Sequence, residues 1–202
     1  MKEFFREFET SNTLPSFFVT WSLSIGITGI YLLFMVLYPY RLLEQSPEVI
    51  ALIGQDNEMI FRGEIYRLFT AIWIHGNVVH LSSNLLFLLI FSSRLEELTR
   101  GFVVVCVFIL SGIIGNLATL LLIFLDINFY SIGASGAIYG LLGALYYHLR
   151  GKSKHEQRKA LYMLILFFMI TIGSDINVFA HLFGLLGGIG SMWIMSLKSA
   201  HH

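Results

Sequence analysis

The sequence predicts an all-α membrane protein with six spanning helices in a single domain. Two observations predict this fold: the composition of the chain and the lengths of its apolar runs. Hydrophobic residues make up 56% of the 202 residues, charged residues only 13%, and the mean hydropathy is +0.74. Soluble domains carry about 25% charged residues, so this chain is too apolar to be one. Its apolar runs approach or exceed the roughly 20 residues that cross a bilayer. Spans of this length use most of the chain and leave no room for a second globular domain.

Charge and cysteine content narrow the possible partners. The 13 basic and 13 acidic residues cancel, so the overall charge does not indicate a nucleic-acid partner. Cys106 is the single cysteine and lies in an apolar run, which excludes an internal disulfide. The first residues are polar and of mixed charge, and a full-length apolar run follows them. We therefore expect no cleavable signal peptide.

The apolar runs divide the chain into segments. We expect an N-terminal segment at residues 1–13, a six-span domain at residues 14–198 and a tail at residues 199–202 that resembles the remnant of a purification tag. The connection at residues 40–70 is too long for a simple loop, so we expect short amphipathic helices within it. The expected spans lie at about 15–38, 71–92, 102–125, 134–149, 161–172 and 179–197.

The positions of Lys and Arg predict the orientation. Ten of the 13 lie in the N-terminal segment, in the connections after spans two and four, and in the tail. Positive side chains collect on the cytoplasmic side of membrane proteins, so we expect both termini to be cytoplasmic. The protein would then be an integral, multi-pass membrane protein whose spans two, four and six all run from outside to inside.

Four polar residues fall at similar depths in these three spans. His80 and Asn84 are i, i+4 neighbours on one face of span two, Ser135 begins the short fourth span, and His181 begins span six. Polar side chains within a membrane are costly and usually face the bundle interior. An isolated serine would most simply hydrogen-bond to its own backbone or to a neighbouring helix. Four polar residues at one depth are better explained as one site.

Small residues surround the serine. Gly133 and Gly136 leave almost no side-chain bulk beside its hydroxyl, so another helix or a bound chain could approach it closely. Gly184 and Gly188 share one face of span six with His181. If this face packs tightly on the glycine side of span four, the imidazole comes within hydrogen-bond reach of the hydroxyl.

A serine and a histidine at that distance form an activated nucleophile, because the imidazole takes the hydroxyl proton as the oxygen attacks a carbonyl. His80 and Asn84, with the Ser135 backbone N–H, could donate hydrogen bonds to the resulting oxyanion. Tyr139 follows four residues later on the same helix face and could stack on the imidazole. No carboxylate is placed to complete a triad: Asp175 is the nearest in sequence, and we do not expect it to touch the imidazole.

Together these motifs resemble those of the rhomboid intramembrane serine proteases. The resemblance covers residues 15–197 and includes the six-span topology and the long first external loop. It departs at Tyr66-Arg67, where similar proteins carry a Trp-Arg pair, and either Glu96 or Glu97 could match the family's glutamate after span two. The matching motifs are Gly133-Ala134-Ser135-Gly136 with Tyr139 and Gly140, the His80-x-x-x-Asn84 pair preceded by His75, and Ala180-His181-x-x-Gly184-x-x-x-Gly188.

The resemblance implies a serine endopeptidase that cleaves transmembrane segments of membrane-protein substrates near the outer face of a bacterial plasma membrane. Its partners would be those substrates and the lipid bilayer, with no cofactor, metal or nucleic acid. Carried across by position, the resemblance implies Ser135 as nucleophile and His181 as general base. It implies His80 and Asn84 as oxyanion-hole groups and Tyr139 as the residue that packs on the histidine.

Three other classes of protein fit less well. A transporter or channel could relay protons through buried histidines, but the spans carry no acidic residue and show no inverted repeat. A metal or haem site is disfavoured because His75 and His80 are five residues apart and no carboxylate or thiolate lies at their depth. A catalytically inactive relative would lack the nucleophile or the base, and both are present.

Two further expectations concern access to the site. The polar connection at residues 173–178 directly precedes His181, so we expect it to act as a lid over a water-filled cavity. Span five carries no ionisable residue and is expected to be the movable wall beside which a substrate helix enters. Truncating Phe167 and Phe168 in this wall should then raise cleavage of a membrane substrate.

Overall fold

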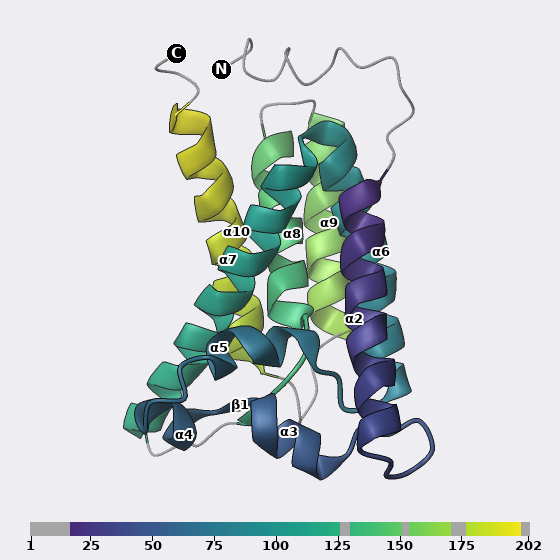
Figure 1. Cartoon of the computed structure of the whole chain (residues 1–202). Helices are drawn as coiled ribbons and strands as arrows, with labels where there is room; N and C mark the ends of the chain where they lie inside the picture. Colours follow the sequence, from purple (N-terminus) through teal and green to yellow (C-terminus); the bar gives the residue numbers. More distant parts are fainter. Residues whose placement is uncertain (1–16, 126–129, 151–153, 171–176, 199–202) are drawn as a thin grey trace.

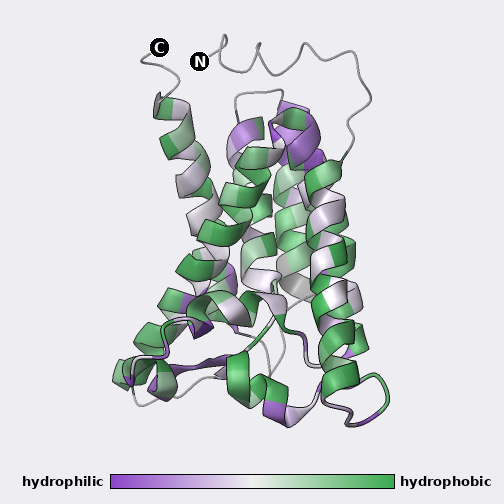
Figure 2. Ribbon diagram, viewed as in Figure 1, coloured by the Kyte–Doolittle hydropathy of each residue, from purple (hydrophilic) through white to green (hydrophobic). Residues whose placement is uncertain are grey.

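The computed structural model describes residues 17–125, 130–150, 154–170 and 177–198, which form a bundle of long helices with a lobe of short helices at one end (Figure 1). Hydrophobic residues cover the long helices, and hydrophilic residues gather at the opposite end of the bundle, where α6 ends and α9 begins (Figure 2). This distribution is that of a protein whose helix sides face lipid and whose ends face water.

The long helices confirm a helical membrane bundle. In the described part of the chain, four helices are long and apolar enough to cross a membrane. Two further helices, α8 (Ser135–Leu149) and α9 (Lys154–Ile170), have 15 and 17 residues. The four long helices are α2 (Phe18–Leu37), α6 (Val78–Leu98), α7 (Gly101–Leu120, continued by the 3₁₀ segment Leu121–Leu125) and α10 (Val178–Lys198).

Two helices begin at residues other than the first residues of the expected spans. The α6 helix begins seven residues after residue 71, because Asn77 is extended and its Oδ1 accepts a hydrogen bond from the His80 N–H at 2.8 Å, which caps the helix. The α9 helix begins at Lys154 rather than near residue 161. Lys, Glu, Gln and Arg favour helix nearly as strongly as Leu does. An apolar run therefore predicts which residues lie in the membrane, but it does not predict where the helix begins and ends.

The long connection between α2 and α6 contains short helices, as expected. They cover the end of the bundle at which α8 begins (Figure 1). A two-residue strand among them, β1, pairs in antiparallel fashion with β2, which precedes α8. The elements are α3 (Pro47–Ile53), β1 (Gln55–Asp56), α4 (Asn57–Phe61), α5 (Arg67–Thr70), the 3₁₀ turn η1 (Ala71–Trp73) and β2 (Tyr130–Ser131).

A buried arginine holds this connection together. The Nη1 of Arg67 donates hydrogen bonds to the carbonyls of Ala51 and Gly54, both at 2.8 Å, and its Nε donates to Glu64 Oε2 at 2.6 Å. These bonds satisfy a guanidinium that would be costly to bury alone. The hydrogen bond from Arg67 also holds the pKa of the Glu64 carboxyl below its usual value. Tyr66, which replaces the tryptophan of similar proteins, donates its hydroxyl to the same carboxylate at 2.9 Å.

Glu96, and not Glu97, is the glutamate with a tertiary role. Its carboxylate accepts hydrogen bonds from the backbone N–H groups of Val19 and Thr20, both at 2.9 Å, and from the Thr20 hydroxyl at 2.7 Å. It thereby caps the first turn of α2, where helix N–H groups have no partner within the helix. Glu97 pairs with Arg94 on its own helix at 2.6 Å. Of the two residues, Glu96 is therefore the one that links α6 to α2.

Candidate active site

Ser135 is presented by a sharp turn between β2 and the central helix α8. Thirteen of the fifteen α8 residues are buried, but Ser135, the first of them, is only partly buried. Gly133 makes the turn with φ +114°, a conformation that a side chain rarely allows. A Cβ at Gly133 would also lie 2.7 Å from Nε2 of His80. The glycine is therefore required by its backbone conformation and by the histidine ring beside it.

The Ser135 hydroxyl and the His181 imidazole form a hydrogen bond, with 2.8 Å between Oγ and Nε2. His181 lies in the first turn of α10 and is 4% exposed. The structure thus brings together two residues that are 46 positions apart in the sequence. Desolvation keeps the pair from exchanging their bond for bonds to bulk water.

Glycine contacts between α8 and α10 make this distance possible. The Cα of Gly184 lies so close to the Gly136 carbonyl, and that of Gly188 so close to the Gly140 carbonyl, that a Cβ on either would collide with backbone. Gly115 of α7 meets the carbonyl of Ala180, which directly precedes the histidine, and a Cβ there would lie 2.6 Å from it. The small residues bring three backbones together around the Ser–His pair.

The His181 ring is held from one side by aromatic residues. The Tyr139 ring stacks on the imidazole with centroids 4.4 Å apart and an interplanar angle of 25°. Phe167 of α9 stacks on the other side of the tyrosine, at 4.5 Å and 27°, and also contacts Phe87 and Phe91 of α6. Tyr139 is fully buried and Phe167 is 3% exposed. The imidazole therefore has one orientation supported by a continuous row of rings.

Asn177 joins the two halves of the site. Its Oδ1 accepts a hydrogen bond from the Ala180 N–H at 3.0 Å and so caps α10. Its Nδ2 donates to Thr119 Oγ1 of α7 at 2.7 Å and to Ser131 Oγ of β2 at 3.1 Å. One side chain thus fixes the start of the histidine helix relative to the strand that leads to the serine.

The His80 side chain lies against the serine turn, and Asn84 is bonded to it one helical turn further along α6. The His80 ring packs on Gly133, and the Asn84 Nδ2 donates to the His80 carbonyl at 2.8 Å, which leaves its second N–H for another acceptor. His75 lies behind them, with its ring centroid 5.1 Å from that of His80, and its Nε2 accepts the Ala134 N–H at 3.5 Å. Burial, and then the nearby His80, lower the pKa of His75 to about 3, so this ring is a neutral acceptor.

Two further predictions concern the surroundings of the serine and the histidine. Asp175 and most of the expected lid, residues 171–176, lie outside the described residues. In the described part of the chain, no three His, Cys, Asp or Glu side chains group in a way that could hold a metal ion. A serine hydrogen-bonded to a histidine, as Ser135 is to His181, can carry out nucleophilic attack with general-base assistance.

Three residues with clear positions here were not assigned to the site from the sequence. Asn177 and Thr119 are ordinary polar residues by type, and their contact arises from helix packing that one sequence does not reveal. Phe167 was expected in the movable wall of span five, and it does contact Phe87 and Phe91 of span two, but its stacking on Tyr139 was not expected. The signal for Asn177 was available, because an asparagine directly before a helix is a typical N-cap.

The fold and the site together define a helical membrane protein with a serine–histidine pair held between closely packed helices near one end of the bundle. A family model described as the Rhomboid domain matches residues 62–198, more than half of the chain. The chain belongs to the rhomboid family, which confirms the resemblance drawn from its motifs.

Individual relatives agree with this assignment. The chain is 37% identical to YdcA of Bacillus subtilis over 134 residues, which are 64% of this chain and 66% of that protein. It is 35% identical to RHOMBOID-like protein 1 of Arabidopsis thaliana over 140 residues, 68% of this chain and 35% of that protein. It is 31% identical to rhomboid protease GluP of Bacillus subtilis over 157 residues, 75% of this chain and 30% of that protein. The chain therefore spans between 30% and 66% of the length of these relatives.

Proposed function

We propose that this protein is an intramembrane serine endopeptidase that cleaves transmembrane segments of membrane-protein substrates with a Ser135–His181 dyad. The observation that carries the proposal is the 2.8 Å hydrogen bond between Ser135 Oγ and His181 Nε2 inside a bundle of the rhomboid family. The protease named GluP among the relatives supports the same reaction class. The catalytic unit is the six-span domain at residues 14–198, with α8 and α9 as its two short spans.

The reaction follows from the two side chains. Ser135 Oγ attacks the carbonyl carbon of the scissile peptide while His181 Nε2 takes the hydroxyl proton. The tetrahedral intermediate collapses as the C–N bond breaks, and the imidazolium returns its proton to the leaving amine. Water then attacks the acyl-enzyme with the same histidine as base, which releases the carboxylate product and regenerates the serine. The Tyr139 ring supports the imidazole in both steps.

Three donors are proposed for the oxyanion. The Ser135 backbone N–H is the first of α8, where the helix offers it no acceptor. The other two are the His80 ring, which lies against Gly133 of the serine turn, and the second N–H of the Asn84 amide, one helical turn further along α6. Preorganised donors of this kind stabilise the charge that develops in the transition state without reorganising.

The length of α8 supports a site below the membrane surface. Its 15 residues extend about 22 Å, whereas the hydrocarbon core is about 30 Å thick. If the far end of α8 reaches one surface, Ser135 lies several ångströms below the other. With both termini in the cytoplasm, as the Lys and Arg positions predict, this is the outer surface. Water would then have to reach Ser135 from that surface.

Labelling with a serine-directed fluorophosphonate tests the proposal. The purified wild-type protein should be labelled at Ser135, and Ser135→Ala and His181→Ala should neither be labelled nor cleave a type I membrane substrate. Removing one hydroxyl leaves no large cavity, so Ser135→Ala should retain wild-type thermal stability. Cleavage by purified Ser135→Ala, or labelling at another serine, would refute the dyad.

A further inference from the structure

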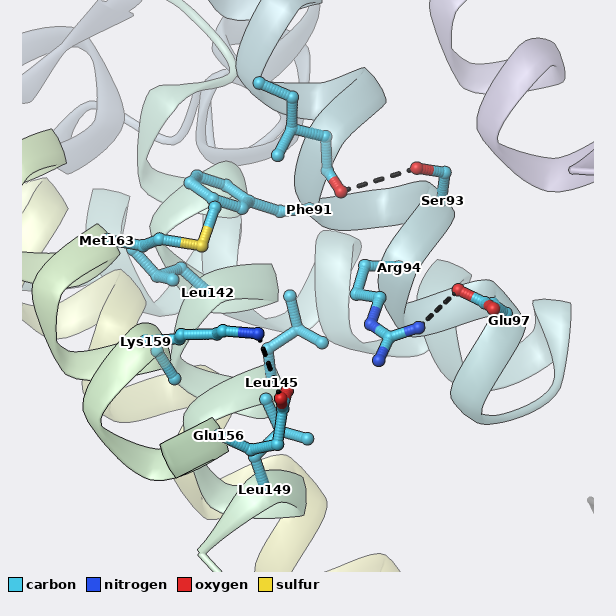
Figure 3. A pocket seen from close by; sticks show the side chains of 12 residues that line it. Phe91, Ser93, Arg94, Glu97, Leu142, Leu145, Leu149, Glu156, Lys159 and Met163 are labelled. Atoms are coloured by element: carbon cyan, nitrogen blue, oxygen red, sulfur yellow. Dashed lines mark hydrogen bonds and ion pairs between the residues drawn. The ribbon is translucent and has the colours of Figure 1, made fainter. Parts of the chain in front are cut away.

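A second site lies at the opposite end of the bundle from Ser135. Here α6, α8 and α9 enclose a cavity of about 580 Å³, within the range of roughly 300–1,000 Å³ of small-molecule sites (Figure 3). Among the described residues, α9 packs more on α8 than on α6, and the cavity lies between α6 and the part of α9 that precedes Phe167. Nothing in the proposed proteolytic reaction uses this cavity.

The inner wall of the cavity is apolar. Phe91 comes from α6, Leu142 and Leu145 from α8, and Met163 from α9, and their side chains surround the space drawn in Figure 3. Apolar cavities do not hold water well, because a water molecule needs two to four polar partners. Between helices of a membrane protein, the apolar group at hand to fill such a space is a lipid acyl chain.

The rim of the cavity carries two ion pairs on two different helices. On α6, Arg94 Nη1 lies 2.6 Å from Glu97 Oε2, and on α9, Lys159 Nζ lies 3.2 Å from Glu156 Oε1. All four side chains line the cavity and are between 33% and 56% exposed. Figure 3 shows the two cationic side chains facing the same space from opposite walls. The rim therefore offers two positive and two negative groups with no net charge.

We propose that this cavity binds a glycerophospholipid with an ethanolamine headgroup. The phosphate would lie between Arg94 and Lys159, the ammonium would bind Glu97 or Glu156, and one acyl chain would fill the apolar wall. A net-neutral rim gives an anionic lipid no overall attraction, whereas a zwitterionic headgroup matches both signs of charge. Ethanolamine also brings three N–H donors for charge-assisted hydrogen bonds to carboxylates, and choline brings none.

Native mass spectrometry of delipidated protein in detergent tests the proposal. The protein is titrated with ethanolamine, choline and glycerol phospholipids that carry the same acyl chains. We expect the ethanolamine lipid to bind about tenfold more tightly than either other lipid, the change expected from one charge-assisted hydrogen bond at a half-exposed site. Equal binding of the ethanolamine and choline lipids, or tightest binding of the glycerol lipid, would overturn the assignment.

Variants separate this site from general attraction to a basic surface. The double variant Arg94→Gln/Lys159→Gln should lose the tenfold preference, whereas Lys154→Gln/Arg158→Gln removes the same charge from α9 outside the cavity and should keep it. Glu97→Gln/Glu156→Gln leaves the cations unbalanced and should turn the preference toward the glycerol lipid. Equal losses in the first two double variants would refute the site.

A cavity-filling variant tests the acyl chain separately from the headgroup. Met163→Trp adds bulk to the apolar wall and should weaken binding of all three lipids together. The rim residues are partly exposed and Met163 is 41% exposed, so these variants should fold. Phe91 lines the cavity and also contacts Phe167, so a lipid bound there should stabilise the packing of α6 on α9. The ethanolamine lipid should therefore raise the midpoint of thermal unfolding of the wild type but not that of Met163→Trp. Undiminished lipid binding to a folded Met163→Trp protein would show that the acyl chain lies elsewhere.

Discussion

The Tyr139 ring stacks on the His181 imidazole with centroids 4.4 Å apart, and the same tyrosine stacks on Phe167 at 4.5 Å. Among the described residues, no carboxylate is hydrogen-bonded to this imidazole, so the stacked tyrosine orients the base. A carboxylate would fix the ring through a hydrogen bond and would stabilise the imidazolium by charge. Stacking fixes the plane of the ring by contact alone, so the proposed dyad depends on aromatic packing that reaches as far as α9.

Substitution of Tyr139 should therefore lower kcat more than it lowers substrate binding. Tyr139→Leu removes the ring and should reduce kcat by about tenfold, an effect of about 1.4 kcal/mol that is typical of one aromatic contact. Tyr139→Phe keeps the ring and should remain within a few-fold of wild type. Steady-state cleavage of a reconstituted membrane substrate measures both. A Tyr139→Leu protein with wild-type kcat would show that stacking does not orient the base.

The proposed oxyanion donors should affect chemistry without abolishing the nucleophile. Asn84→Ala should lower the cleavage rate by roughly 10²–10³, the usual contribution of one such donor, and His80→Ala should also be impaired. Both should still react with a fluorophosphonate at reduced rates, because Ser135 and His181 are intact. Wild-type activity in both variants would mean that these residues only pack the bundle.

Asn177 should act as a positioning residue for the dyad. Asn177→Asp retains an oxygen that can cap α10 but loses the donors to Thr119 and Ser131, so the link between the two halves of the site is broken. We expect fluorophosphonate labelling of Asn177→Asp to slow by about tenfold, with a smaller loss in Thr119→Val, where one of the two bonds remains. The comparison is made at the same fraction of folded protein, measured by thermal unfolding. Labelling at the wild-type rate in both would leave Asn177 with a capping role only.

Glu96 and Glu97 are adjacent, and their contacts predict that substitution of Glu96 lowers the stability of the protein more than substitution of Glu97. Glu96→Gln weakens a carboxylate that accepts three hydrogen bonds from the start of α2, and should destabilise the protein by about 1–3 kcal/mol. Glu97→Gln is the matched control, because its partner Arg94 is half-exposed and such pairs contribute about 1 kcal/mol or less. Thermal unfolding in one detergent checks both. Equal shifts for the two variants would contradict the assigned role of Glu96.

The sequence was sufficient for the bundle and for the pairing of helices around the site. The spans could be predicted because apolar length is a local property, and the glycine faces of residues 136–140 and 184–188 because close helix packing demands small residues. The partners of Glu96 and Asn177, and the stacking of Phe167 on Tyr139, could not be predicted. Each depends on the rotation of one helix against another, which a single sequence does not specify. The start of α6 was missed for a different reason, since Asn77 is a capping residue within an otherwise apolar context.

The position of Phe167 also changes the expected consequence of truncating the α9 wall. Phe167 is 3% exposed and supports Tyr139, so Phe167→Ala would disturb His181 as well as loosen α9 from α6. We now expect this variant to lower cleavage of every substrate. The side chain of Phe168 lies outside the described residues, so the test of the wall is better made from α6.

Phe87 offers that test, because its ring centroid lies 4.2 Å from that of Phe167 across the α6–α9 contact. If a substrate helix enters between α6 and α9, Phe87→Ala should lower the cost of separating them and raise cleavage of a full-length membrane substrate by several-fold. A short soluble peptide could reach Ser135 from the aqueous side, so its cleavage should change little. Leu86→Ala is the control, since Leu86 is on the same helix and its side chain is 55% exposed. Assays of reconstituted protein with both substrates separate an effect on substrate entry from an effect on the chemical step. Should Phe87→Ala leave membrane-substrate cleavage unchanged while the fold stays intact, access beside α9 would have to give way to another route.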